Sequence, residues 1–545
     1  MSNPIPVLVG TESGNAEYYA EQLVKAIIDA GTAARTIDMG DFEPDHIARL
    51  RTVLIVTSTY GNGGPPGNAE QLLHYLETSE VDLTCVEFAV CGLGSTMFDN
   101  FAQCGKDFEA ALLARGATRA VDRADCDEGD DDAFEQFKDD VLAYLQSAAK
   151  RVHEASAKVA AQQTPSRPVT DPPALAEGNA PRASGRRTLV PVVAKRLLSA
   201  PGSNKETMHY ELDLTGTTLS YEVGDSFALH PDNMSEEIVE VIQAAGLTGA
   251  EVVQRDGGPT TLEQALRRCC LLTVGRPLLE ALAETGGAAK DVLQAGPEQA
   301  SQYLQQRHVI DVLREHRQAS LDAQTLVSLL RKIGPRLFSV ASSPTRDPNR
   351  VAFTVETVRY EWNDRPVRGV ATCWLADRVQ VGDQVPVHVV PNPAFRLPRD
   401  GRPVIMVGPG TGIAPFMAHL AEMEASAING ETWLFFGHQR ESKDFLYRRE
   451  ILGWRDSGVL TRSDFAWSRD QNHKVYVQHK LADRGREVWR WLERGAEIYV
   501  CGDAERMEPA VRRAFEELAA TRGRVDGRAW LDQAKAEGRY RTDVY

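Results

Sequence analysis

Short, continuous apolar runs alternate with amphipathic segments over the first 150 residues. The runs IPVLVG, TVLIVTST and VEFAVCGLG are typical of strands buried on both faces of a sheet. The segments NAEYYAEQLVKAIIDAG, DNFAQCGKDFEAALLARG and DDAFEQFKDDVLAYLQ have the spacing of amphipathic helices. This alternation predicts a doubly wound α/β domain with a parallel sheet over residues 1–150.

The pattern changes further along the chain. Residues 151–183 are rich in Ala, Gln, Pro and Ser, which predicts a flexible linker. Residues 184–400 are expected to form a β-barrel interrupted by a helical insertion at about residues 233–333, which are rich in Ala, Leu, Glu and Gln. Residues 401–545 return to strand–helix alternation and predict a second parallel sheet.

Composition narrows the class of protein. The 545 residues are 42% hydrophobic and 25% charged, as in a multidomain globular chain. No stretch approaches the ~20 apolar residues of a membrane-spanning helix, and no secretory signal is visible, so we expect a cytoplasmic protein without a membrane segment. The eight cysteines form no CxxC pair, so no metal site is predicted.

The net charge of −16 lies entirely within residues 1–150. This charge disfavours a nucleic-acid ligand and suggests an acidic docking face, although a solvated surface that only aids solubility is the alternative. The most acidic stretch runs from Asp122 to Asp132. It lacks the ligand order of a calcium-binding EF-hand, so docking of a basic electron acceptor is the preferred interpretation.

Three segments that follow predicted strands contain residue types that suit a first nucleotide-binding site. Hydroxyls and a glycine at a helix start suit a phosphate, and no GxxxxGK[ST] motif points to a P-loop kinase. In each of the other two segments one aromatic lies among small residues, and two such rings can sandwich a planar ligand. A capped helix start and ordinary packing are the alternatives. The segments comprise Thr11, Glu12, Ser13, Gly14, Asn15 and Ala16; Ser58, Thr59, Tyr60, Gly61, Asn62 and Gly63; and Cys91, Gly92, Leu93, Gly94 and Phe98.

With these motifs, residues 5–145 resemble a flavodoxin-type FMN domain. The resemblance implies that Tyr60 and Phe98 flank the isoalloxazine of FMN. Ser95 stands where such families usually have Asp or Asn, and Phe98 where they usually have Tyr. The FMN phosphate would be held by Thr11, Ser13, Gly14 and Asn15.

Two motifs in the second half of the chain suit another flavin. The guanidinium of Arg336 can pair with a pyrophosphate, and the hydroxyl of Ser339 can donate to a flavin ring. The strings RLFS and GVAT resemble the RxYS and GxxS/T motifs of the ferredoxin–NADP⁺ reductase superfamily, which bind FAD. Phe338 replaces the usual Tyr. The residues concerned are Arg336, Leu337, Phe338, Ser339, Gly369, Val370, Ala371 and Thr372.

The nonapeptide GPGTGIAPF follows the strand PVIMV and resembles the NADP-domain signature of the same superfamily. Its proline disfavours a plain Rossmann dehydrogenase, and Met417 stands where the family often has Arg. Further on, two basic and two hydroxyl side chains suit the 2′-phosphate of NADPH, with exposed surface residues as the alternative. The predicted nucleotide contacts are Gly410, Thr411, Gly412, Ser468, Arg469, Lys474, Tyr476, Gln478 and Asp503.

The end of the chain completes the predicted hydride-transfer group. Cys501 ends a buried strand, and a packed cysteine is the alternative to a role near nicotinamide. By the same resemblance, the C-terminal Tyr545 covers the FAD ring and must move for NADPH to approach. The resemblance makes Ser339, Cys501 and Asp543 the catalytic residues.

Three nucleotide sites in the order FMN, FAD and NADP identify the chain as a member of the diflavin reductase family. The resemblance implies that electrons pass from NADPH to FAD, then to FMN and to a haemoprotein. The segments around Ser468 and the C-terminus look closest to the flavoprotein component of assimilatory sulfite reductases. A general reductase serving a haem monooxygenase and a scaffold with lost cofactor sites are the alternatives. The sequence leaves oligomerisation open.

Overall fold

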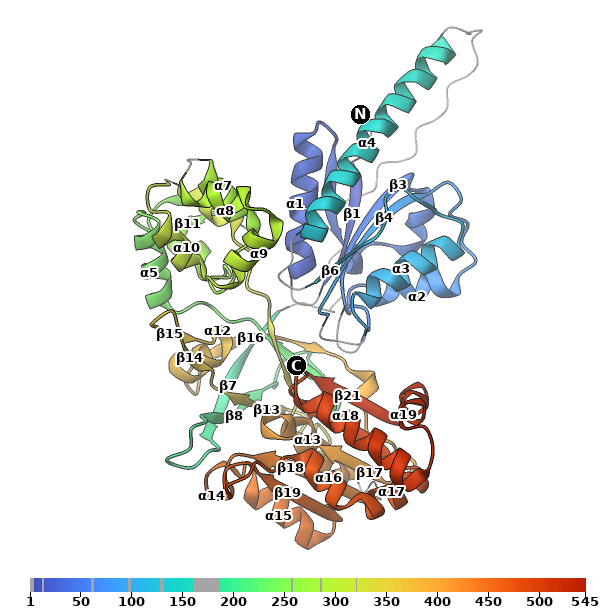
Figure 1. Ribbon diagram of the computed structural model, residues 1–545, viewed down its shortest axis with the longest axis vertical. Coiled ribbons are helices and arrows are strands. Elements are labelled where there is room, and N and C mark those ends of the chain that lie inside the picture. The colour runs from blue at the N-terminus through green and yellow to red at the C-terminus, as the bar shows by residue number, and fades with distance from the viewer. Residues whose placement is uncertain are drawn as a thin grey trace. The chain divides into compact units, whose positions relative to one another are not determined.

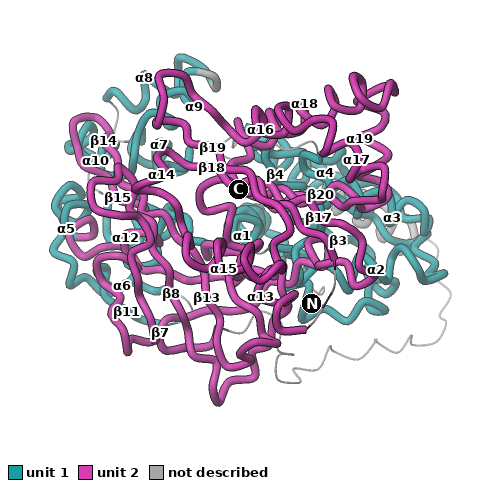
Figure 2. Tube along the Cα trace, turned by 90° about the horizontal axis from the view of Figure 1, so that it is seen from below, with its two compact units in different colours: residues 1–184, 239–334 teal, residues 185–238, 335–545 magenta. Residues whose placement is uncertain are grey.

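The computed structural model describes residues 4–11, 14–59, 63–96, 100–127, 132–160, 187–255, 258–284, 287–319, 321–426, 428 and 430–545. For residues 149–160, 297 and 298 it describes the backbone alone. The chain divides into two compact units, residues 1–184 with 239–334 and residues 185–238 with 335–545 (Figure 2).

The first unit contains a parallel sheet in the order β2-β1-β3-β4-β5, with β6 paired to β4 (Figure 1). Its strands are β1 (Ile5–Gly10), β2 (Ala34–Asp38), β3 (Thr52–Ser58), β4 (Glu87–Gly94), β5 (Thr118–Arg119) and β6 (Ala124–Asp127). Its helices are α1 (Asn15–Asp29), η1 (Met39–Asp41), η2 (Pro44–Arg49), α2 (Glu70–Thr78), α3 (Gln103–Ala114) and α4 (Asp132–Ala160).

Two apolar cores lie on the two faces of this sheet. Side chains of α1 and α4 form one core with the strands, and side chains of α2 and α3 form the other. Four consecutive residues of β3, Val53–Val56, are fully buried, which explains why the strand is apolar without alternation. The predicted doubly wound sheet is confirmed. Helix α4 continues to Ala160, ten residues into the segment expected to be a linker, and residues 161–186 lie outside the described chain.

The segment expected to be a helical insertion is mostly helical and also holds one hairpin. The hairpin pairs β10 (Val252–Arg255) with β11 (Gly258–Thr261). The helices are α5 (Ser235–Ala244), α6 (Leu262–Leu266), α7 (Arg276–Ala283), α8 (Ala288–Gln294), α9 (Pro297–Gln305), α10 (Val309–Glu315) and α11 (Ala323–Leu329).

The second unit begins with an antiparallel sheet in the order β12-β9-β16-β7-β8-β13. An isolated bridge between Val340 and Phe353 joins the end of β12 to β13, so the two edge strands of this sheet meet. The strands are β7 (Thr188–Leu197), β8 (Thr207–Asp213), β9 (Ser226–Leu229), β12 (Arg336–Ser339), β13 (Arg350–Glu356) and β16 (Gln384–Val390). The hairpin β14 (Arg359–Trp362) and β15 (Arg365–Arg368), with α12 (Val370–Cys373), η3 (Trp374–Arg378) and η4 (Pro393–Phe395), complete this part.

A second parallel sheet follows in the order β19-β18-β17-β20-β21. Helices α13 and α15 cover one face, and α16 to α19 cover the other. Its strands are β17 (Val404–Val407), β18 (Thr432–His438), β19 (Arg462–Trp467), β20 (Glu497–Gly502) and β21 (Tyr540–Val544). Its helices are η5 (Gly410–Ile413), α13 (Ala414–Ser426), α14 (Glu441–Asp444), α15 (Arg448–Ser457), α16 (Val477–Asp483), α17 (Gly485–Glu493), α18 (Met507–Leu518), η6 (Ala519–Gly523) and α19 (Gly527–Ala536).

The fold class expected from the sequence is therefore confirmed. Across the described ranges, none of the helices combines the length and the apolar character needed to cross a bilayer. In the same ranges, His, Cys, Asp and Glu side chains form no group of three or more that could hold a metal ion.

Candidate active site

Three residues predicted to act together in hydride transfer meet in the second unit. Ser339 ends β12, Cys501 lies in β20, and Asp543 lies opposite Cys501 in the paired strand β21. The hydroxyl of Ser339 donates to Oδ2 of Asp543 at 2.6 Å, and the thiol of Cys501 donates to the same oxygen at 3.8 Å. Two donors from different sheets therefore converge on one carboxylate oxygen.

Burial dominates the electrostatics of this cluster. It raises the pKa of Asp543, and the hydrogen bonds from Ser339 and Cys501 oppose that rise because they favour the carboxylate. Burial, and next the nearby Asp543 charge, raise the pKa of the fully buried Cys501 thiol well above its usual value. Cys501 is therefore a protonated donor and not a thiolate nucleophile.

The C-terminal Tyr545 is held at the end of β20 and at the turn that follows β17. Its backbone N–H donates to the carbonyl of Gly502 at 3.1 Å, and its hydroxyl shares a hydrogen bond with the hydroxyl of Thr411. Tyr545 is 62% exposed as a whole residue. Gly412 allows the turn to lie against β20, because a Cβ there would come within 2.1 Å of the Cys501 carbonyl oxygen.

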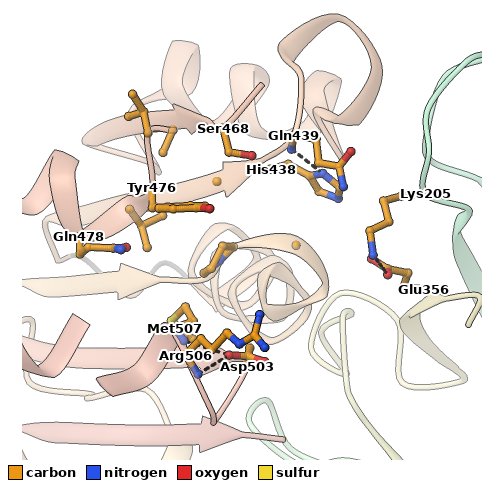
Figure 3. A pocket seen from close by; sticks show the side chains of 16 residues that line it. Lys205, Glu356, His438, Gln439, Ser468, Tyr476, Gln478, Asp503, Arg506 and Met507 are labelled. Atoms are coloured by element: carbon orange, nitrogen blue, oxygen red, sulfur yellow. Dashed lines mark hydrogen bonds and ion pairs between the residues drawn. The ribbon is translucent and has the colours of Figure 1, made fainter. Parts of the chain in front are cut away.

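A cavity of about 460 Å³ lies beside this turn, at the carboxyl ends of the strands. Predicted residues that line it are Gly410, Ser468, Tyr476, Gln478 and Asp503 (Figure 3). Oδ1 of Asp503 accepts the backbone N–H groups of Arg506 at 2.6 Å and Met507 at 2.9 Å, which fixes that carboxylate at the start of α18. The cavity has the position and size of a nucleotide site.

Other lining residues were not singled out from the sequence. They are Lys205, Glu356, Pro409, Gly437, His438, Gln439, Ala466, Val475, Val477, Arg506 and Met507. Lys205, which precedes β8, and Glu356, the last residue of β13, form an ion pair. Both are far in sequence from the strands of the parallel sheet, so no local pattern could link them to this site. Because His438 and Gln439 directly follow the apolar run TWLFFG, their position after a buried strand was the available signal. Arg469 and Lys474 are exposed and lie outside the lining.

The segments predicted to bind FAD lie on β12 and α12. Phe338 stacks against Phe353 with ring centroids 5.5 Å apart. The Thr372 hydroxyl accepts the backbone N–H of Val358 at 3.1 Å, so it already stabilises the turn that begins at Gly369. Of the other residues predicted to bind FAD, Val370 and Ala371 are buried, Leu337 is half-buried and Arg336 is exposed.

The predicted phosphate segment of the first unit lies between β1 and α1. The hydroxyl of Thr11 accepts the backbone N–H of Gly14 at 2.9 Å, and Gly14 has a φ of 83°, which a glycine adopts without strain. Among the described residues, no side chain caps α1, so the first-turn N–H groups after Asn15 suit a phosphate. Ala16 is buried in the core. The predictions for Glu12, Ser13, Tyr60, Gly61, Asn62 and Phe98 lie outside the described residues.

The segments after β3 and β4 lie close together. A Cβ on Gly63 would come within 2.7 Å of Cβ of Asn100, which follows β4 in the chain. The hydroxyl of Ser58 donates to the Gly10 carbonyl at 3.3 Å, and the hydroxyl of Thr59 accepts the N–H of Cys104 at 3.2 Å. These hydroxyls therefore stabilise the strand ends.

Cys91 to Gly94 belong to β4 itself and not to the loop after it. The Cys91 thiol is buried 3.6 Å from the Cys126 thiol, and Leu93 is also buried. A Cβ on Gly92 or Gly94 would meet the backbone at the start of α3, at 3.1 Å or 2.6 Å. These four residues therefore pack within the first unit, and their predicted contact with FMN stays a prediction.

Comparisons with known proteins agree with this architecture. The flavodoxin family model matches residues 7–139, the FAD binding domain model residues 180–374, and the oxidoreductase NAD-binding domain model residues 406–513. These matches confirm the predicted cofactors FMN, FAD and NADPH.

The similarity to known proteins covers the whole chain. The Sulfite reductase [NADPH] flavoprotein alpha-component of Bacillus subtilis (strain 168) is 36% identical over 100% of this chain and 90% of its own. The protein of the same name from Serratia proteamaculans (strain 568) is 36% identical over 99% of this chain and 90% of its own. The chain therefore belongs to the family of the sulfite reductase [NADPH] flavoprotein alpha-components.

Proposed function

We propose that this chain is the NADPH-oxidising flavoprotein of a sulfite reductase and passes electrons to a haemoprotein that reduces sulfite to sulfide. The full-length similarity to alpha-components favours this role over a general reductase for a haem monooxygenase. The single observation that carries the proposal is the convergence of Ser339 and Cys501 on Asp543 within a chain of this family.

The two flavins would supply the change from a two-electron donor to a one-electron acceptor. The chain would bind the first flavin phosphate through Thr11, Gly14 and the N–H groups at the start of α1. The β12 segment from Arg336 to Ser339 would hold the second flavin. Ser468 and Tyr476 line the cavity where the NADPH 2′-phosphate would bind, with Arg469 and Lys474 nearby in sequence.

Asp543 would act as the charged member of the hydride-transfer group. Its carboxylate accepts from Ser339 and Cys501, so both donors are held in fixed positions. A carboxylate at this place stabilises positive charge that develops on nicotinamide as hydride leaves. Tyr545 lies on the same side of the sheet end, through its contacts with Gly502 and Thr411, and we propose that its ring must move before nicotinamide can approach.

The acidic stretch from Asp122 to Asp132 would receive a basic face of the haemoprotein. Asp125 pairs with Arg123 at 2.7 Å, Asp127 accepts the Thr96 hydroxyl at 2.5 Å, and Asp132 pairs with Arg276. Asp122 also pairs with Arg119, at 3.6 Å, but its side chain is 96% exposed. Asp122 is therefore the best placed of the described aspartates to meet a partner, while residues 128–131 lie outside the described chain.

The domain boundaries that we propose are those predicted from the sequence. We propose an FMN domain at residues 1–150, a linker at 151–183, an FAD domain with its insertion at 184–400 and an NADP domain at 401–545. We also propose a cytoplasmic location, where NADPH is supplied.

Reconstitution tests this function. The purified chain is combined with the haemoprotein of a sulfite reductase, and sulfide is measured with NADPH and sulfite. Sulfide that requires both proteins supports the proposal. Robust reduction of ferricyanide by NADPH without any sulfide would overturn the assigned acceptor and leave the NADPH reductase activity standing.

Asp122→Lys probes the docking surface in the same assay. We expect weaker sulfide formation at unchanged ferricyanide reduction, and a larger difference from wild type at low ionic strength. Glu80→Lys is the matched control, because Glu80 is another exposed acidic residue of the same domain. Equal effects of the two variants would overturn the assigned docking stretch.

A further inference from the structure

His438 lines the nucleotide cavity, and one of its ring nitrogens is a buried polar atom without a partner among the described residues. It is the last residue of β18 and lines the cavity, and its side chain is only 4% exposed (Figure 3). Among the described residues, no group forms a hydrogen bond with its Nε2. Buried polar atoms without partners are uncommon in folded proteins, so this nitrogen requires an explanation.

The other ring nitrogen determines where the proton resides. The backbone N–H of Gln439 donates to Nδ1 of His438 at 2.8 Å. A backbone N–H can only donate, so Nδ1 must be the acceptor. The neutral imidazole therefore carries its proton on Nε2, the atom that lacks a partner.

The charged groups around His438 are consistent with a neutral imidazole that carries its proton on Nε2. Burial lowers the pKa of His438, whereas the carboxylates of Asp444 and Glu356 raise it and Lys205 lowers it. Oδ2 of Asp444 lies 3.8 Å from Nδ1 but already accepts the backbone N–H of Arg440 at 2.8 Å, and its Oδ1 accepts the Ser203 hydroxyl. Asp444 thus has donors of its own, and His438 remains neutral.

The strand order shows which part of a dinucleotide would reach Nε2. Strand β18 lies between β19, which leads to Ser468, and β17, which leads to the turn at Gly410. A dinucleotide that runs from a 2′-phosphate near Ser468 to a nicotinamide near Cys501 must cross the end of β18. Its ribose and diphosphate oxygens pass there, and all of them are hydrogen-bond acceptors.

We propose that the Nε2–H of His438 donates a hydrogen bond to a ribose or diphosphate oxygen of bound NADPH. This inference rests on the proposed function for the identity of the ligand. It assigns His438 to nucleotide binding, with a protonation state fixed by the Gln439 backbone.

Two substitutions at His438 distinguish the loss of the N–H donor from the loss of the imidazole ring. His438→Leu removes the N–H at similar volume, whereas His438→Gln keeps an N–H donor at a similar reach. By calorimetry we expect the Kd for NADP⁺ to rise about tenfold in the Leu variant and no more than about threefold in the Gln variant. His419→Gln is the matched control, because His419 is fully buried outside the cavity and its Nε2 bonds to the Phe395 carbonyl.

Adenosine 2′-phosphate, which lacks the diphosphate, locates the acceptor. An equal loss of affinity for this probe in His438→Leu would indicate an oxygen of the adenosine half, and a loss confined to NADP⁺ would indicate the diphosphate or the second ribose. Both outcomes support the proposal. Unchanged NADP⁺ binding in His438→Leu would overturn it, as would equal losses in the Leu and Gln variants.

A spectroscopic readout does not depend on turnover. In protein with ¹⁵N-labelled histidine, His438→Gln assigns the His438 signals. We expect Nε2 to carry the proton and its signal to shift when NADP⁺ is added. A proton on Nδ1 would refute the inference. Failure of the wild-type chain to bind NADP⁺ would be a distinct result, since it would remove the proposed function itself.

Discussion

Each of the two parallel sheets of this chain has its proposed ligand-binding segments at the carboxyl ends of its own strands, but the two proposed sites are built differently. In the first unit the proposed FMN segments each follow their own strand directly, as at β1 and β3. In the second unit Ser339 and Asp543 are 204 residues apart and come from different sheets. A site made of local segments can be found from local patterns, whereas a composite site depends on the folded topology.

This difference decides which features of the chain can be predicted from its sequence. Both parallel sheets were predicted because strands covered by helices on two faces must be continuously apolar. The hydride-transfer group was expected only through family resemblance, since nothing local links Ser339 to Asp543. Nothing local links the cavity residues Lys205 and Glu356 to this site either, because both precede the parallel sheet in the chain by many residues.

One residue type can serve two purposes at the end of a strand. Gly92 and Gly94 suggest a ligand-binding loop, and in the structure they lie in β4 and allow α3 to approach it closely. Glycine permits close approach of a helix as well as of a cofactor, and the sequence does not distinguish the two. The domain boundaries and the roles of individual site residues remain predictions.

The largest effect is expected from Gly412→Ala, which should damage the composite site alone. The new Cβ would lie 2.1 Å from the Cys501 carbonyl oxygen, and neither backbone can move away easily. We expect a loss of about 3 kcal/mol in the unfolding free energy of the second unit. Urea unfolding and flavin analysis should show weakened FAD retention with FMN retained.

Gly453→Ala is the control for that substitution. Gly453 lies within α15, and no heavy atom lies within 4 Å of an added Cβ. Alanine favours the helix, so stability should be unchanged or slightly higher. If Gly412→Ala released FMN as readily as FAD, the two sites would not be independent and the comparison would fail.

Asp543→Asn should slow hydride transfer about 100-fold, because it removes the charge on which two donors converge. Anaerobic stopped-flow measurement of flavin reduction by NADPH tests this. Burial raises the pKa of Asp543 above 3.8, so the carboxylate is lost as pH falls through that higher value. The wild-type rate should therefore fall toward acid pH, and the Asn variant should lack this dependence.

Ser339→Ala tests whether Asp543 is the titrating group, since it removes one hydrogen-bond donor to Asp543 and keeps the carboxylate charge. We expect a smaller loss of rate than in Asp543→Asn and an acid limb shifted to higher pH, because one bond that stabilises the carboxylate is gone. Identical pH profiles in wild type and both variants would show that Asp543 does not titrate in this step.

Tyr545→Ala should raise the ratio of NADH to NADPH use by about tenfold, as expected if an aromatic ring must be displaced before nicotinamide can bind. Steady-state kinetics with both nucleotides measure the ratio. Tyr545→Phe keeps the ring and removes only the contact with Thr411, so it should change the ratio much less. An equal change in the two variants would assign the effect to the hydroxyl.

The smallest effect concerns the buried thiols, and each region places at least one of them in a β-strand. In the first unit Cys91 faces another thiol, Cys126, whereas in the second Cys501 faces a carboxylate. The contact with Cys126, and then burial, raise the pKa of Cys91, and burial raises the pKa of Cys104 to about 12. A thiol with a pKa near 12 has a thiolate fraction about 1,000-fold below that of a free cysteine.

Iodoacetamide should therefore modify the native protein first at the exposed Cys85, while Cys91, Cys104 and Cys501 react only on unfolding. Peptide mass spectrometry over a time course gives the order. Asp543→Asn provides the contrast between the regions: it removes the charge that helps keep Cys501 protonated and leaves Cys91 untouched. A modest gain in labelling at Cys501 alone would show that the carboxylate acts on this thiol, whereas a parallel gain at Cys91 would indicate general loosening of the fold.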